Sequence, residues 1–432
     1  MAEQEGKEQK PKIINENEVN TTAYSWIVAI LVMLSYAVSF VSRNVWTVAM
    51  PIAIPEMGLS MTLAGGLMTA YYIGYVISNF ITGFMVDRVG PRLTLSLATI
   101  LTGIFTILIP FAPNYWSIAA LRVLAGASSG PLFACVVKYQ ISWFSPQFRA
   151  TAMGLMMAGP AVGGSIANLI FAPIVTSQGW RQGFFYAALT CVVVAVLVYF
   201  MCKEQGASAM RSNVTDNQSA EDKALQSAGL KSVIFKRSFI LGTFACFLSI
   251  GINMVYTTYI LTYFTSVRGF EMVTASMIIG STGMLGLVTG IVAGMVSDII
   301  GSKKICIYIG VAVCFVCTLL IMTASSTPIL IAVICLRLLG AAFMGNSLNA
   351  LQAQAAVGPF AGRSMGFYNG VAQAGSIVFP LVFGVILDLT DLNYSLMFYG
   401  MAAAILVFFV LVFFMDEKKV VRASKAKVAE AE

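Results

Sequence analysis

The sequence predicts an all-α membrane protein in which twelve transmembrane helices form two pseudo-symmetric six-helix bundles. Hydrophobic residues make up 58% of the 432 residues and charged residues only 10%, whereas soluble domains have about 45–50% and about 25%. Apolar stretches recur along the chain, each of about 20 residues or more and thus long enough to cross ~30 Å of hydrocarbon. A motif of the first half also returns in the second half. This composition excludes a soluble enzyme, a nucleic-acid-binding protein and a secreted disulfide-bonded scaffold.

The apolar stretches fall into two sets of six, and each stretch predicts one helix. The first set covers residues 24–53, 61–86, 93–112, 115–143, 149–175 and 181–202, and the second covers 238–265, 272–299, 304–324, 328–356, 363–387 and 395–415. Residues 203–237 are rich in Ser, Asn, Gln and charges, which predicts a linker. We therefore expect bundles at 24–202 and 238–415, with polar tails at 1–23 and 416–432.

Positive charge predicts the orientation of the helices, because cytoplasmic loops carry the excess of Lys and Arg. Twenty of the 26 basic residues lie in the two tails, the linker and the loops on the same side as these. Only Arg181 and Arg268 lie in loops on the opposite side. Both termini and the linker are therefore predicted to be cytoplasmic, as in a multi-pass protein of a bacterial inner membrane.

The chain offers no group of residues typical of a metal site, a cofactor site or an enzyme active site. Its eight cysteines lie mostly singly in apolar stretches, and the one CxxC pair, Cys314 and Cys317, has apolar neighbours. A thiol in such surroundings behaves as a small hydrophobic group. Histidine, a common proton carrier and metal ligand near neutral pH, is absent. We expect no enzymatic activity, no metal and no cofactor.

An internal repeat supports the division into six and six helices. The stretch GFMVDRVGPR, from Gly83 to Arg92, returns 211 residues later as GMVSDIIGSK, from Gly294 to Lys303. The sequence RVLAG at 122–126 has a counterpart in RLLGA at 337–341, and Gly-Ser-Ile at 164–166 returns at 375–377. Such a duplication is typical of transporters built from repeated bundles.

The first copy of the loop motif, together with RxxxGxxxG at 122–130, resembles the signature motifs of the major facilitator superfamily. The resemblance covers residues 24–415 and implies two six-helix halves that rock against one another. It also implies that the loop motif locks the cytoplasmic ends of the halves together; the alternative is that its charges only mark the membrane boundary. The residues assigned to this gate are Gly83, Asp87, Arg88, Gly90, Arg92, Asp298 and Lys303. Arg122 and Arg337 occupy matching places, and packing, gating and substrate contact all stay open for them.

Arg43 is the most informative candidate for substrate binding. It follows nineteen residues without a charge, Tyr24 to Ser42. A helix that enters the membrane near Trp26 places Arg43 ~25 Å along its axis at 1.5 Å per residue. A central arginine costs about 2.5–3.5 kcal/mol on insertion scales, so it normally faces a cavity with a counter-charge or a ligand. No Asp or Glu lies in the middle of a predicted helix to pair with it. We therefore expect Arg43 to bind an anionic ligand.

The segment from Arg43 to Pro51 resembles the first helix of the anion:cation symporter family and, more distantly, of the organophosphate:phosphate antiporters. In both families an arginine at this position binds the anionic group of the substrate, which in the symporters is a sugar acid or another organic anion. The antiporters have a second arginine in helix 7, whereas residues 238–265 contain no basic residue. A single central cation predicts a monoanionic substrate.

Energy coupling is where the sequence departs from these relatives. Proton-coupled members of the symporter family have acidic residues at two places that are occupied here by Ser42 and Ser129. A serine does not titrate in the physiological range. Facilitated diffusion, anion exchange and coupling through an ion bound by oxygens therefore stay open beside symport.

The other candidate substrate contacts are polar or aromatic residues on the predicted helices. Tyr36 and Trp46 share a helix face with Arg43. Lys138 either reaches the cavity or snorkels to the inner interface. An amide is costly in lipid unless it has a partner, so packing between helices is the alternative for each amide. The remaining candidates are Tyr72, Tyr75, Asn253, Tyr256, Asn346, Asn349, Asn369 and Gln373.

Taken together, these residues predict a secondary active transporter that moves a small organic anion, such as a sugar acid or hydroxycarboxylate, by alternating access. The alternatives are an anion exchanger or uniporter for an organophosphate or sulfonate, a metabolite or drug exporter, and a receptor without transport. An exporter of apolar or cationic cargo would favour acidic cavity residues, which the sequence lacks. The expected partners are the anion, the lipid bilayer and, if transport is coupled, an ion; we expect a monomer that binds no nucleic acid.

Overall fold

A computed structural model describes residues 21–145, 147–203, 234–355 and 361–417. The side chains of residues 80, 81, 83, 84, 87, 150, 298 and 361–363 lie outside the described set. All regular secondary structure in the described ranges is helical. The all-α class predicted from the sequence is therefore confirmed.

The first half of the chain contains α1 to α9. Their bounds are α1 Ala23–Met57, α2 Met61–Val89, α3 Pro91–Leu108, the 3-10 turn η2 Ile109–Phe111, α4 Tyr115–Ser129, α5 Pro131–Trp143, α6 Arg149–Met156, α7 Gly159–Leu169, α8 Phe171–Gln178 and α9 Trp180–Met201. Two of the predicted helices are broken, at Pro131 and near Pro160, and each proline lies in the first turn of the helix that follows. A proline is tolerated in a first turn because its missing N–H would have no helical partner there.

The second half contains α11 to α17. Their bounds are α11 Arg237–Ser266, α12 Met272–Ile300, α13 Lys303–Thr323, α14 Thr327–Ala355, α15 Ala361–Gln373, α16 Gly375–Leu389 and α17 Tyr394–Phe413. In the described part of the chain, eleven helical spans are long and apolar enough to cross a membrane. With α2, a further helix of 29 residues, they agree with the twelve predicted helices.

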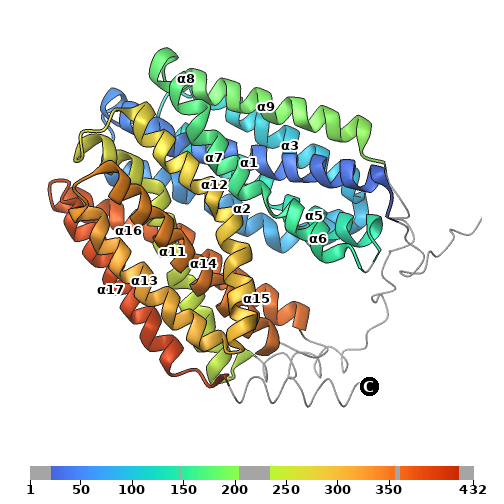
Figure 1. Cartoon of the computed structure of the whole chain (residues 1–432). Coiled ribbons are helices and arrows are strands. Elements are labelled where there is room, and N and C mark those ends of the chain that lie inside the picture. Colours follow the sequence, from blue (N-terminus) through green and yellow to red (C-terminus); the bar gives the residue numbers. More distant parts are fainter. Residues whose placement is uncertain (1–20, 146, 204–233, 356–360, 418–432) are drawn as a thin grey trace, which may run out of the picture.

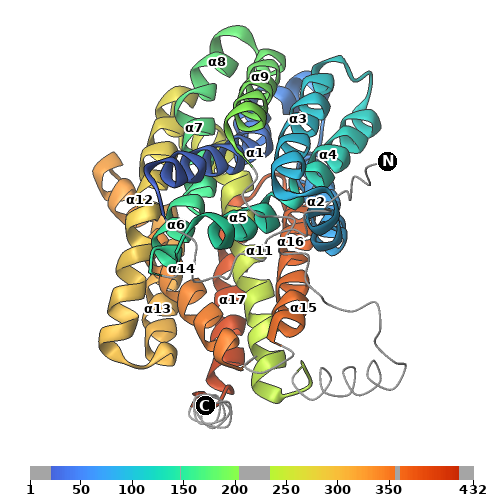
Figure 2. The ribbon, with the colours of Figure 1, turned by 90° about the vertical axis from the view of Figure 1, so that its right-hand side faces the viewer.

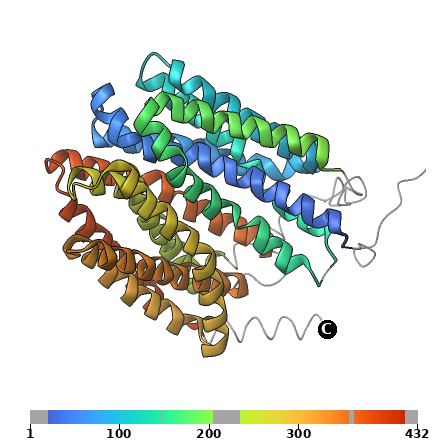
Figure 3. The same ribbon diagram turned by 45° about the horizontal axis from the view of Figure 1, so that its top comes forward.

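The two halves form separate groups of helices. In Figure 1, α1 to α9, coloured blue to green, lie toward the upper right, and α11 to α17, coloured yellow to red, lie toward the lower left, with α12 next to α7. Figure 3 shows the same separation from a tilted direction. The halves meet mainly where α2 packs against α16 and α7 packs against α12, with a smaller contact between α1 and α11. Figure 2, viewed at a right angle to Figure 1, shows α11 near the centre of the molecule beside α16.

The halves are joined by hydrogen bonds at the end where α2 begins. The Asp388 carboxylate of α16 accepts hydrogen bonds from the backbone N–H groups of Met61, at 2.7 Å, and Thr62, at 2.8 Å. The Tyr259 hydroxyl of α11 donates to the Met61 carbonyl at 3.3 Å. Gly384 also permits close approach, because a Cβ there would lie 2.8 Å from the Met61 carbonyl oxygen. A helix N-terminus favours a carboxylate, so Asp388 binds the first turn of α2 across the interface.

The interface opens toward the opposite end, where α1 begins. On α12, a Cβ at Gly280 would lie 2.6 Å from the Leu169 side chain of α7. Gly294 lies on nearly the same face of α12, ~21 Å further along at 1.5 Å per residue. A Cβ there would meet no atom of the described residues within 4 Å. A Cβ at Gly154 of α6 would likewise meet nothing. The contact between α7 and α12 is therefore close near Gly280, and the described residues make no comparable contact at Gly154 and Gly294.

Candidate functional site

A cavity of about 450 Å³ lies between the two halves. This volume suits a small organic molecule. It is lined by seven residues that the sequence singled out as substrate contacts: Tyr36, Arg43, Tyr72 and Tyr75 from the first half, and Asn253, Tyr256 and Gln373 from the second. Residues more than 200 positions apart in the chain therefore share one cavity.

Arg43 lies near the middle of α1 and is half-buried in the cavity wall. Its Cζ atom lies 3.4 Å from the ring centroid of Phe40 and 5.2 Å from that of Tyr72. Its buried Nε atom has no hydrogen-bond partner. Among the described residues no carboxylate pairs with Arg43; the one ion pair described joins Arg181 to Glu56, outside the cavity. The guanidinium is thus held by aromatic rings and retains unused donors for an anion.

Arg122 of α4 has the opposite environment, although it lies close to Arg43. It is 1% exposed, and its guanidinium donates to the carbonyl oxygens of Leu67, Ser42 and Arg43 at 3.3, 3.2 and 3.1 Å. It also contacts the sulfur of Met68 at 3.2 Å. These bonds tie α4 to α1 and α2, which is the packing role left open by the sequence.

Arg337 of α14, the repeat counterpart of Arg122, lines the cavity. It is also 1% exposed, but its Nε and Nη1 atoms have no hydrogen-bond partner among the described residues. Its Cζ atom lies 3.8 Å from the ring centroid of Tyr256, whose hydroxyl is also buried without a partner. The cavity therefore contains a second arginine that the sequence did not assign to substrate binding.

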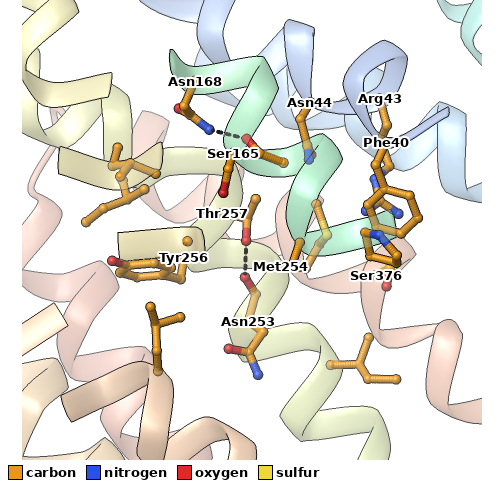
Figure 4. Close-up of a pocket in the computed structure, with 18 of the residues that line it drawn as sticks. Phe40, Arg43, Asn44, Ser165, Asn168, Asn253, Met254, Tyr256, Thr257 and Ser376 are labelled. Carbon is orange, nitrogen blue, oxygen red and sulfur yellow. Dashed lines mark hydrogen bonds between the residues drawn. The ribbon is translucent and has the colours of Figure 1, made fainter. Parts of the chain in front are cut away.

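Several cavity residues were not singled out by the sequence as substrate contacts. Figure 4 shows Asn44 beside Arg43 on α1, Ser165 and Asn168 on α7, and Thr257 on α11. Asn44 Oδ1 and Ser165 Oγ are buried without partners, so Asn44 can accept a hydrogen bond from a ligand and Ser165 can accept or donate one. Ser376 also lines the cavity and matches Ser165 in the Gly-Ser-Ile repeat. That repeat was the sequence signal for this pair, whereas Asn44 and Asn168 had none.

Five candidate residues lie outside the residues that line the cavity. Trp46 is fully buried, and its indole N–H donates to the Ala64 carbonyl at 2.9 Å. The amide of Asn346 donates to the Gly290 carbonyl at 3.2 Å, and that of Asn349 accepts from the Tyr368 hydroxyl at 2.6 Å. Lys138 lies half-buried on α5, and Asn369 is exposed on α15. The bonds of Trp46, Asn346 and Asn349 join neighbouring helices, which was the alternative considered for the two amides.

The candidate gating residues are only partly described. The side chains of Gly83, Asp87 and Asp298 lie outside the described set. Gly90 ends α2 and precedes α3 with φ +90°, a backbone conformation that favours glycine.

The basic members of the candidate gate lie at helix ends. Arg88 is exposed in the last turn of α2, and the Arg92 guanidinium donates to the Tyr199 carbonyl at 2.9 and 2.5 Å. The backbone N–H of Lys303, at the start of α13, donates to the Glu417 carboxylate at 2.6 Å. The bonds given for Arg92 and Lys303 each lie within one half, so a lock between the halves stays a prediction.

Ser42 and Ser129, which stand where the family resemblance predicts acidic residues, form hydrogen bonds with other hydroxyl groups. Ser42 and Thr106 share a hydrogen bond of 2.5 Å between their hydroxyls, and Ser129 accepts from the Tyr71 hydroxyl at 2.9 Å. Both serines are buried. A serine hydroxyl forms hydrogen bonds but neither takes up nor releases a proton near neutral pH, so these two positions provide no titratable site.

Comparison with known proteins agrees with this architecture. The sequence profile of the Major Facilitator Superfamily matches residues 32–369 and 285–431. The crystal structure of a mutant of the nucleoside transporter NupG superposes with a TM-score of 0.75 at 13% identity, covering 91% of this chain and 99% of that one. The chain belongs to the Major Facilitator Superfamily, whose members are multi-pass membrane transporters and not enzymes.

Two similar proteins within the superfamily are named as transporters of organic anions. The hexuronate transporter of Bacillus subtilis is 26% identical over 276 residues, which are 64% of this chain and 65% of that protein. The probable sulfoacetate transporter SauU of Cupriavidus necator is 25% identical over 383 residues, which are 84% of this chain and 87% of that protein. Both relatives are named for substrates that carry acidic groups.

Proposed function

We propose that this protein transports a small organic anion across the plasma membrane by alternating access, with Arg43 as the anchor for the anionic group. The single observation that carries this proposal is the half-buried Arg43 guanidinium in the cavity wall, which has no carboxylate partner among the described residues. An anion would supply the missing acceptors, and charge-assisted bonds to a guanidinium are short and directional. The anionic substrates in the names of the two relatives support the same class.

The cavity wall suits a substrate with hydroxyl groups next to its anionic group. Asn253 of α11 donates one amide N–H to the Ser249 carbonyl at 2.9 Å, and Asn168 donates to the Gly164 carbonyl at 2.9 Å. Each amide has a second N–H and a carbonyl oxygen left over for a ligand. A polyhydroxylated acid, such as a sugar acid, would use both kinds of group.

Alternating access is supported by the asymmetry of the interface. The halves are joined where α2 begins and separate toward the end where α1 begins. With the termini on the cytoplasmic side, as the positive charges predict, this arrangement corresponds to an inward-open state. Cysteine labelling at Ser325, an exposed residue at the joined end, should then succeed from outside intact cells.

Exchange or uniport is favoured over proton symport by the hydroxyl pairs at Ser42 and Ser129. Neither serine provides a carboxylate that could take up a proton when the substrate binds. Symport with an ion bound by oxygens is the coupled alternative. A drug exporter is disfavoured by the cationic cavity, and a receptor without transport would bind the anion but move none.

Uptake into proteoliposomes tests the proposal most directly. Arg43→Lys keeps the charge but loses the two-pronged guanidinium, so uptake of a sugar acid should fall about tenfold. Arg43→Leu removes both and should reduce uptake about a hundredfold or more. Arg181→Leu is the matched control, because Arg181 is exposed and paired with Glu56 outside the cavity. Normal uptake by a well-inserted Arg43→Leu variant would contradict the proposal.

A further inference from the structure

The unpaired Arg337 is the feature that the proposed function leaves unexplained. Its guanidinium is 1% exposed, lies in the cavity wall and has two buried nitrogen atoms without hydrogen-bond partners. An arginine stays charged in proteins, and an unpaired buried charge is strongly disfavoured. The Tyr256 ring, whose centroid lies 3.8 Å from Arg337 Cζ, stabilises the cation through its π face. It does not replace the missing hydrogen-bond acceptors of the guanidinium.

Comparison with Arg122 shows that a buried arginine in this fold need not lack hydrogen-bond partners. The two arginines occupy matching places in the internal repeat and are equally buried. Arg122 donates to three backbone carbonyl oxygens, whereas Arg337 leaves Nε and Nη1 unused. The protein therefore provides backbone acceptors for the donors of Arg122, whereas two donors of Arg337, at the cavity, have no acceptor.

The two cavity arginines belong to opposite halves. Arg43 lies on α1, and Arg337 lies on α14 against Tyr256 of α11. Figure 4 shows Arg43 on one side of the cavity and Tyr256 on the other, with Met254 and Thr257 between them. A ligand that reaches both cations must therefore carry acidic groups at two separate positions.

We propose that Arg337 and Tyr256 form a second anion subsite, so that the substrate is a dianion whose two acidic groups bridge the halves of the protein. An aldaric acid or a sulfonated carboxylic acid has this form. The proposal rests on the organic-anion function above and replaces the monoanion expected from a single central cation. The buried Tyr256 hydroxyl, which also has no partner, adds a neutral donor to the same subsite.

Binding to the purified full-length protein, measured by isothermal titration calorimetry, tests this proposal with two matched ligand pairs. Galactarate and galactonate differ only in a terminal carboxylate or CH₂OH group, and so do sulfoacetate and 2-hydroxyethanesulfonate. A second charge-assisted contact predicts that the dianion of at least one pair binds about tenfold to a hundredfold more tightly than its monoanion. Equal affinities within each pair would overturn the second subsite, while Arg43-dependent binding of the monoanions would leave the proposed function intact.

Substitution of Arg337 separates a binding role from a structural one. Arg337→Gln should bring the dianion affinity down to that of the monoanion, and Arg337→Lys should restore part of the difference. Arg181→Gln, outside the cavity, should keep the wild-type ratio. A loss of thermal stability with the ratio unchanged, or an equal loss for both members of a pair, would overturn the proposal. If Arg337→Gln does not fold, the wild-type ratio decides, and Tyr256→Phe should reduce that ratio. Binding of none of the four anions would instead refute the proposed function itself.

Discussion

The contact between Asp388 and the first turn of α2 holds the joined end of the molecule closed, and substitution of Asp388 tests this role directly. Asp388 belongs to α16 of the second half, and it accepts from Met61 N–H at 2.7 Å and Thr62 N–H at 2.8 Å. The change Asp388→Asn keeps the size of the side chain and removes its charge. One amide oxygen remains to accept, and the N-terminus of α2 loses its counter-charge.

The size of the effect follows from the two bonds. A hydrogen bond to a charged group contributes about 1.5–3 kcal/mol when buried, and a charge at a helix N-terminus adds about 0.3–1 kcal/mol. Asp388 is partly exposed, and exposed charges contribute less. We therefore expect Asp388→Asn to weaken the closed end by about 1–2 kcal/mol, which shifts the equilibrium about 5- to 30-fold toward its opening.

Double electron–electron resonance measures this shift as a change in distance between spin labels. Gln178, at the end of α8, and Ser325, before α14, are exposed residues of opposite halves near the joined end. The population with a longer distance should grow in Asp388→Asn.

Asp391→Asn is the matched control for this measurement. Asp391 is exposed three positions further on, with a positive φ that asparagine also adopts. The same shift in both variants, or no shift in Asp388→Asn, would refute the role assigned to the Asp388 contact.

Three further predictions concern stability and coupling. Arg122→Leu should lower the melting temperature, because three backbone carbonyl oxygens lose their donor. Arg337→Leu should leave the melting temperature of the ligand-free protein unchanged or raise it, and the reverse order of the two variants would contradict the roles assigned to the two arginines. Gly126→Ala should destabilise, because its Cβ would collide with the Tyr71 carbonyl, while Gly154→Ala, where a Cβ meets nothing, should stabilise by up to about 1 kcal/mol in thermal unfolding. In proteoliposomes, preloaded anion should accelerate uptake, and a pH gradient alone should not drive accumulation of a fully ionised substrate; strong accumulation would reveal a proton site that Ser42 and Ser129 do not provide.

The sequence by itself determined the class and the layout of the helices. In lipid, every backbone N–H and C=O group needs a hydrogen-bond partner within the protein, which long apolar helices provide. The number of helices and their approximate bounds can therefore be predicted from hydrophobicity alone. The same physical chemistry identified Arg43, because an intramembrane charge without a local counter-charge needs a cavity or a ligand. Six aromatic or amide candidates, among them Tyr36 and Asn253, also line the cavity. Polar side chains are costly against lipid and therefore face other helices or a cavity.

Tertiary structure alone decided which polar groups are satisfied. The segments RVLAG at Arg122 and RLLGA at Arg337 are nearly alike, yet one guanidinium meets backbone carbonyls of α1 and α2 and the other meets the Tyr256 ring and the cavity. The spacing of Trp46 and Arg43 predicted one common helix face, but the Trp46 indole N–H donates to the Ala64 carbonyl instead of facing the cavity. Periodicity specifies a face of a helix, whereas the acceptors that this face meets come from residues distant in the chain. For this reason the sequence offered Arg43 and Lys138 as substrate contacts and left the role of Arg337 open, whereas Arg43 and Arg337 are the cations that line the cavity of the packed molecule.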